Sequence, residues 1–209
     1  MAIVRPRDAA TVILVRPDAS GRPTVLMGRR SRRAAFVPDV FVFPGGRAEA
    51  GDEPLPVGAP LQAGEAARLP AAAAAGPLRA RRLASAGVGE TGEETGYLAG
   101  ASTAENDALR PDHSALRFSA RAITPRESPI RFHARFFLAD GTALTAAPAG
   151  SGELTDLAWF PLEEARRLPV IDVTEFVLDA LPRLAAGPSQ MPLFAYRNGR
   201  PAVRWPGAP

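Results

Sequence analysis

Residues 87–97 read GVGETGEETGY, and the interpretation of the whole chain starts from this stretch. Read as a helix, it places Glu90, Glu93 and Glu94 at positions i, i+3 and i+4, within one arc of the helix surface. Three like charges on one face repel one another, and the nearby glycines weaken the helix further. Clustered carboxylates are ligands that Mg²⁺ and Mn²⁺ accept. The stretch therefore predicts either a divalent-metal site or a solvated acidic face.

A second informative stretch lies upstream, where residues 41–52 read FVFPGGRAEAGD. It is an apolar strand that runs into the paired glycines Gly45 and Gly46 and then into an acidic loop. Glycine pairs allow a backbone to turn tightly or to approach a ligand closely. This pattern indicates a strand and turn beside a binding site.

Together the two stretches resemble the signature of the Nudix hydrolase family. The matching positions are Gly46, Asp52 in place of a glutamate, Glu90, Glu93, Glu94, Gly96 and the bulky Tyr97. Gly89 stands where the family has an arginine that braces the catalytic glutamate, and Thr91 replaces an apolar residue. The 36 residues 53–88 stand where the family usually has seven. This split signature is similar to the subgroup that includes the peroxisomal coenzyme A diphosphatases of animals.

The resemblance implies an α/β/α sandwich with a mixed sheet, within the α+β class. We expect one domain over residues 1–209, with an insertion at 53–80 inside the signature and a C-terminal extension at 188–209. The insertion is rich in Ala, Pro, Leu and Gly. That composition fits either a helical excursion at the rim of the site or a disordered segment.

The resemblance also implies hydrolysis of a diphosphate that is linked to another moiety, with Mg²⁺ or Mn²⁺ as cofactor. The implied metal ligands are Glu90, Glu93 and Glu94 together with the backbone of Gly46, and the same glutamates are the expected catalytic residues. Glu153 is a candidate general base, or alternatively an exposed loop acid.

Substrate contacts are expected near an arginine-rich run at residues 29–33, which holds four arginines and one serine. Guanidinium groups pair with phosphate oxygens in a bidentate way, so the run is either a phosphate clamp or a solvated loop. We expect substrate contacts from Arg30 and Ser31, and from Phe43 and Arg47 beside the glycine turn.

Composition excludes several classes of chemistry. All 25 basic residues are arginine, so no Schiff-base or P-loop lysine exists, and zero cysteines exclude thiolate catalysis and disulfides. The arginines are scattered, which argues against a nucleic-acid polymer as partner. No apolar run reaches the roughly 20 residues of a membrane span, and residues 1–8 lack a signal-peptide core. We expect a cytoplasmic protein with a small-molecule diphosphate substrate.

The hydrophobic periodicity predicts an alternation of strands and a few helices. Expected strands cover 9–15, 24–28, 40–43, 114–123, 130–138 and 152–160, expected helices cover 78–96, 161–168 and 173–186, and a hairpin covers 194–203. Nudix domains often pair, and the edge strand of this hairpin would suit a homodimer.

Two functional hypotheses remain open at this level. The first is the enzyme, with coenzyme A or an acyl derivative as the favoured substrate and dinucleotides, ADP-ribose or other nucleoside diphosphate derivatives as alternatives. The second is a catalytically impaired Nudix-like module that binds a nucleotide or a protein, which Gly89 and Asp52 favour. Retention of three mutually repelling glutamates favours the enzyme.

Overall fold

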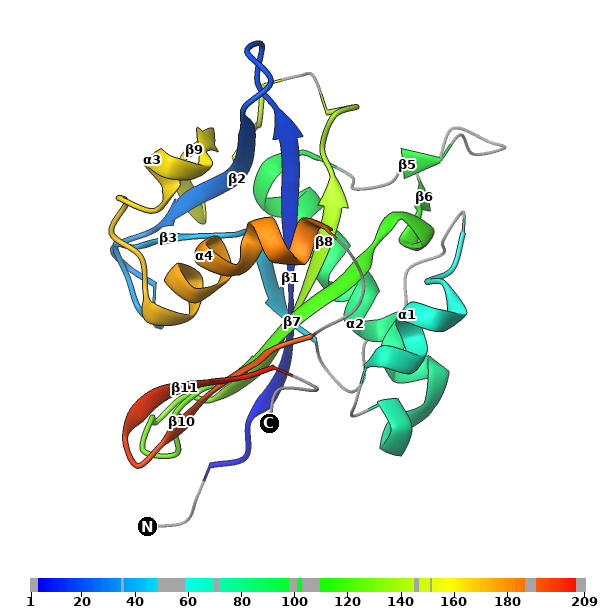
Figure 1. Ribbon diagram of the computed structural model, residues 1–209, viewed down its shortest axis with the longest axis vertical. Coiled ribbons are helices and arrows are strands. Elements are labelled where there is room, and N and C mark those ends of the chain that lie inside the picture. The colour runs from blue at the N-terminus through cyan, green and yellow to red at the C-terminus, as the bar shows by residue number, and fades with distance from the viewer. Residues whose placement is uncertain are drawn as a thin grey trace.

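The fold is a large mixed sheet with helices on both faces (Figure 1). The computed structural model describes residues 4–34, 36–48, 59–69, 72–97, 101–102, 110–144, 147–150, 152–186 and 191–205. Within these residues one sheet has nine strands, and its main path runs β11-β10-β7-β8-β1-β2-β3. The predicted mixed sheet sandwiched between helices is confirmed.

Four long strands form the middle of the sheet. They are β1 (Arg7–Pro17), β2 (Pro23–Arg30), β7 (Arg117–Ile123) and β8 (Phe132–Asp140). β1 and β2, the strands expected at 9–15 and 24–28, form an antiparallel hairpin, whereas β1 and β8 run parallel. β1 thus lies near the centre of the sheet.

Five further strands complete this sheet. They are β3 (Phe41–Val42), β4 (Gly45–Arg47), β9 (Leu154–Pro161), β10 (Leu193–Arg197) and β11 (Arg200–Arg204). β4 pairs with β1 and β9 with β2, while β10 joins β7 in parallel. β5 (Ala101–Ser102) and β6 (Arg110–Pro111) form a separate small pair. The predicted hairpin at 194–203 is confirmed, because Asn198 and Gly199 both have positive φ, at 51° and 73°.

Two long helices cover opposite faces of the sheet. α4 (Asp172–Ala186) crosses in front of β1 in Figure 1, and α2 (Ala72–Thr95) lies behind it. Alternate residues of β1 enter two separate cores: Ile13 packs with α4, whereas Val12 and Leu14 pack with α2. A Cβ on Gly87 would lie 3.3 Å from atoms of Ala10 and Val12, so this glycine lets α2 approach β1 closely.

Three predicted boundaries are wrong in detail. α2 begins at Ala72 rather than near Leu78, and it ends as predicted before Gly96, whose φ of +71° suits glycine. The helix expected at 161–168 is only α3 (Leu162–Ala165), with Pro161 as its N-cap. The strand expected from 114 starts at Arg117, because a 3-10 turn, η1 (His113–Ala115), precedes it.

Two leucines in the described part of the expected insertion belong to the core. α1 (Ala63–Arg68) confirms its helical character, but Leu61 and Leu69, on either side of α1, are 8% and 1% exposed. Glu65 also accepts a 2.8 Å hydrogen bond from the backbone N–H of Phe118. A rim position was expected, and the buried leucines show instead that this segment stabilises the α2 face.

None of the described helices combines the length and apolar character needed to cross a bilayer.

We expect Gly45→Ala to destabilise the fold strongly. Gly45 has a φ of +151°, and a Cβ there would lie 2.4 Å from the Ala10 carbonyl oxygen and 2.6 Å from Thr11 Cα, both in the β1 backbone. The free energy of unfolding in urea should fall by about 2–3 kcal/mol. Gly21→Ala is the matched control, because Gly21 also has positive φ but open space around it, and it should cost about 1 kcal/mol. Equal losses in the two variants would show that the β1–β4 contact is not tight.

Candidate active site

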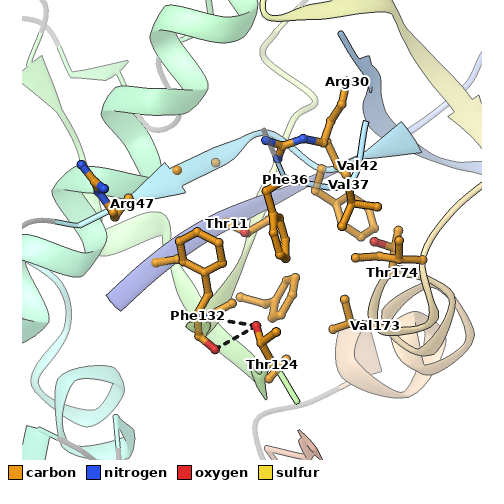
Figure 2. Close-up of a pocket in the computed structure, with 18 of the residues that line it drawn as sticks. Thr11, Arg30, Phe36, Val37, Val42, Arg47, Thr124, Phe132, Val173 and Thr174 are labelled. Carbon is orange, nitrogen blue, oxygen red and sulfur yellow. Dashed lines mark hydrogen bonds between the residues drawn. The ribbon is translucent and has the colours of Figure 1, made fainter. Parts of the chain in front are cut away.

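A cavity of about 810 Å³ opens on the α4 side of the sheet, beside the end of α2 (Figure 2). Its walls come from segments far apart in sequence: β1, the loop after β2, β3, β4, α2, β7, β8, the start of α4 and β10. Charged residues line one part of it, and aromatic and aliphatic residues line the rest. This combination of a polar region and an apolar chamber is typical of a small-molecule site.

Two glutamates of α2 face the cavity. Glu90 and Glu94 are one helical turn apart and both line the cavity wall. Glu94 is 7% exposed, and one of its carboxylate oxygens accepts a 2.9 Å hydrogen bond from the backbone N–H of Gly45. Thr91, on the same helix, is fully buried, and its hydroxyl donates to the Gly87 carbonyl oxygen at 2.7 Å. The threonine that departs from the family signature is thus satisfied within the helix.

The environment of Glu94 disfavours its charged form. Burial raises the pKa of Glu94 to about 7, against the stabilising hydrogen bond from Gly45. The neighbouring charges of Glu90 and Glu153 contribute to this raised pKa, and the charge of Arg30 acts to lower it. Three carboxylates and one guanidinium therefore act on one another at this end of the cavity.

Gly46 supplies the space that Glu90 occupies. A Cβ at position 46 would lie 2.1 Å from the carboxyl carbon of Glu90 and 2.3 Å from one of its oxygens. Only glycine lets this carboxylate lie against the β4 backbone. The paired glycines of the sequence thus have separate roles, since Gly45 pairs with β1 and holds Glu94, and Gly46 accommodates Glu90.

Glu153 joins the cavity from another part of the sheet. It immediately precedes β9 and lines the cavity, although it is exposed overall. Its backbone carbonyl accepts a 3.1 Å hydrogen bond from the N–H of Ser31. Ser31 itself does not line the cavity, and its hydroxyl accepts from the N–H of Arg33 at 3.2 Å. Ser31 therefore connects the arginine loop to Glu153.

Only one side chain of the arginine-rich run lines the cavity. Arg30 points into it from the end of β2 (Figure 2), and its buried Nε has no hydrogen-bond partner among the described residues. Arg29 pairs instead with Asp39 at 2.8 Å, and Arg32 is 80% exposed. Of the other predicted substrate contacts, Phe43 and Arg47 both line the cavity.

Glu93 does not share the environment of its neighbours. Its side chain is exposed and does not line the cavity, although helical spacing predicted one shared face. Among the described residues, no group of three or more His, Asp or Glu side chains is arranged to hold a metal ion. Asp52 lies outside the described residues, and the ligand role of Glu93 stays a prediction.

Sequence reasoning missed much of the cavity wall. Phe36 and Phe132 contact each other edge to face on this wall, with ring centroids 5.1 Å apart, and Asp172 and Tyr196 also line it. The alternation of Phe132, Ala134 and Phe136 along β8 was a usable signal, since all three face the cavity. No local pattern identifies Asp172 or Tyr196, because only the fold brings α4 and β10 together.

Solved structures of Nudix hydrolases are similar to this chain. The crystal structure of a Nudix hydrolase from Alicyclobacillus acidocaldarius is 27% identical, with a TM-score of 0.69 over 90% of this chain and 94% of that one. A C. elegans Ap4A hydrolase is 15% identical, with a TM-score of 0.53 over 87% of this chain and 98% of that one. The NUDIX domain of Shewanella oneidensis NrtR, complexed with ADP ribose, is 11% identical, with a TM-score of 0.55 over 87% and 90%.

No family model matches the sequence, and no curated protein matches it either. The similarities to solved Nudix structures nevertheless extend over nearly the whole chain. The fold is that of the Nudix hydrolases, and the 27% identical Nudix hydrolase supports a hydrolase.

We expect the metal-free protein to lose stability as pH rises from about 4.5 to about 7, because of Glu94. Below pH 4.5 the carboxyl is protonated in both folded and unfolded chains; between 4.5 and 7 the unfolded chain ionises while the folded one keeps its proton. The ionisation of Glu94 should lower the free energy of unfolding by about 3 kcal/mol at most. Urea unfolding in a chelator at several pH values measures it.

Glu94→Gln should remove this dependence, because glutamine stays neutral and still offers an acceptor to the Gly45 N–H. The variant should therefore gain stability relative to wild type as pH rises. Glu93→Gln is the matched control, since Glu93 is exposed and should keep the wild-type slope. A wild-type slope in Glu94→Gln would contradict the burial of this carboxylate.

Proposed function

We propose that this chain, with its Nudix hydrolase fold, is a divalent-metal-dependent hydrolase that cleaves a diphosphate bond in a nucleoside diphosphate linked to another moiety. The observation that carries the proposal is the meeting of Glu90, Glu94 and Glu153 around the Gly45–Gly46 strand, in a cavity that also holds Arg30. Carboxylates at this density, beside an arginine and an apolar chamber, suit a cation and a phosphorylated organic molecule.

The donor set fits a hard divalent cation. Oxygen ligands from Glu90 and Glu94, with the backbone carbonyl of Gly46, would hold Mg²⁺ or Mn²⁺, and Glu93 is a further candidate ligand. Burial is the main cause of the raised pKa of Glu94 and repulsion from Glu90 and Glu153 adds to it, and a bound cation would favour the ionised carboxylate against both effects. A divalent cation here supplies the positive charge that neutralises a diphosphate and acidifies water.

The other residues have separate roles in this proposal. Arg30 binds a phosphate oxygen through its guanidinium group, and Arg47 does the same from β4. Glu153, which the Ser31 backbone holds, takes the proton from the attacking water as the general base. Phe43 and the apolar wall exclude water from the organic part of the substrate and orient it.

The group that is attached to the diphosphate of the substrate is the part of the proposal that the described residues specify least. Coenzyme A or an acyl derivative is the first candidate, from the similarity of the split signature. The structural neighbours include an Ap4A hydrolase and a domain complexed with ADP ribose, so dinucleotides and ADP-ribose belong in the same panel. All of these share a diphosphate that joins a nucleoside to a second group.

A nucleotide-binding module without catalysis is the second candidate. Gly89 in place of the bracing arginine favours it, as does the lack of a preformed three-acid cluster in the described part of the chain. The deciding experiment is a phosphate-release assay across the diphosphate panel, with Mg²⁺, Mn²⁺ or chelator. Metal-dependent turnover supports the enzyme, and tight binding of a nucleotide without turnover supports the module.

We expect Glu90→Gln and Glu94→Gln each to lower metal-dependent kcat/KM by about 100-fold or more, since each removes a proposed ligand. Glu93→Gln should lower it less, because its side chain is exposed and away from the cavity. Steady-state kinetics at saturating Mg²⁺ and an unfolding curve for each variant provide the test. Wild-type turnover by Glu94→Gln would refute the metal assignment, and an equal loss in all three variants would restore Glu93 to the ligand set.

We expect Gly46→Ala to lower activity by displacing the Glu90 carboxylate. The added methyl group would overlap the flexible end of Glu90, so the side chain can move while the backbone stays in place. The fold should therefore persist, in contrast to Gly45→Ala, while the apparent affinity for Mg²⁺ falls. Unchanged Mg²⁺ dependence in a folded Gly46→Ala protein would show that Glu90 does not act from this position.

A further inference from the structure

The end of the cavity away from Arg30 contains an acid that the proposed metal chemistry does not use. Asp172, at the start of α4, lines the cavity together with Thr174 and with Tyr196 of β10. In Figure 2, Arg30 lies on one side of the cavity, and Thr124 and Val173, the neighbour of Asp172, lie on the other. The charges that act most on Glu94 are Glu90, Glu153 and Arg30, and Asp172 is not among them. Asp172 is thus a separate carboxylate.

Two donors fix the orientation of this carboxylate. One oxygen accepts a 2.8 Å hydrogen bond from the backbone N–H of Val173, and the other accepts the hydroxyl of Tyr196. Burial raises the pKa of Tyr196, and the hydrogen bond to Asp172 raises it further, so the hydroxyl keeps its proton. Tyr196 is itself held edge to face against Phe194 at 5.6 Å.

Asp172 retains acceptor capacity toward the cavity. A carboxylate has about four lone-pair sites and cannot donate, and the two known donors use one on each oxygen. No described arginine forms an ion pair with Asp172. An aromatic band that includes Phe36 and Phe132 also lines the cavity. A ligand that spans the cavity would meet hydrogen-bond acceptors at this end.

We propose that Asp172, held in place by Tyr196, selects substrates whose organic group carries an exocyclic amino donor at the end remote from the diphosphate. The chemical class is an amino-substituted heterocycle, such as a base with an exocyclic amino group, stacked on the aromatic band. A base with a carbonyl at the same position brings an oxygen against the carboxylate and is disfavoured. This inference rests on the proposed function, because it places the diphosphate at the glutamates.

The test inverts the polarity of this end with a nearly isosteric side chain. Asp172→Asn keeps an oxygen for the Val173 N–H, so the fold should persist. It replaces the other oxygen with an N–H₂ donor. The probes are matched pairs that differ in amino against carbonyl: ADP-ribose with inosine diphosphate ribose, and CDP-glucose with UDP-glucose. Both kcat/KM and the Kd in a non-hydrolysing condition, with Ca²⁺ or chelator, are measured.

Wild type should prefer the amino member of at least one pair, and Asp172→Asn should shift that preference toward the carbonyl member by about 10–100-fold. Tyr196→Phe is the matched positioning variant. It keeps the ring but loses the donor, so it should weaken the preference less than Asp172→Asn does. Thr174→Val, on the same wall, should leave the preference of the pair unchanged.

The outcomes separate the two proposals. A shift of preference in Kd without any turnover would overturn the hydrolase and support the role of Asp172. Turnover with the same preference in wild type and Asp172→Asn, or an equal loss on both members of each pair, would overturn the role of Asp172 alone. Failure of every probe to bind or react would overturn both.

Discussion

The contact between the glycine strand β4 and the acidic end of α2 is the constraint on which the site depends. β4 must pair with β1 through Gly45 and still leave room for Glu90 beside Gly46. The hydrogen bond from the Gly45 N–H to Glu94 then fixes the helix relative to the strand. Because β1 is also the centre of both cores, the position of the carboxylates is set by the packing of the whole domain.

Much of the architecture could be predicted from local patterns. The apolar run of β1, the hairpin turn at Asn198 and Gly199, and the helix end at Gly96 each follow from rules that involve only neighbouring residues. The mixed sheet between helices followed from the resemblance of the split signature to the Nudix hydrolase family. The predictions of these features were correct because the local conformational preference and the tertiary structure agree at those positions.

The details of the site depend on contacts that no local rule contains. Helical spacing groups Glu90, Glu93 and Glu94, but the direction in which that group faces is set by how Gly87 packs against β1. The result separates buried Glu94 from exposed Glu93. In the same way, Leu61 and Leu69 enter the core although their segment reads as low-complexity sequence, and Asp172 meets Tyr196 only through the fold.

The parallel pairing of β10 with β7 has a consequence for the order in which the cavity forms. During synthesis from the N-terminus, Glu90 and Glu94 emerge about a hundred residues before Tyr196. Before Tyr196 emerges, β1, β2 and β8 at the centre of the sheet have been synthesised together with α2 and can pack against one another. The cavity wall contributed by β10 does not yet exist at that stage. A nascent chain would thus acquire the glutamates of α2 long before it acquires the cavity wall that contains Tyr196.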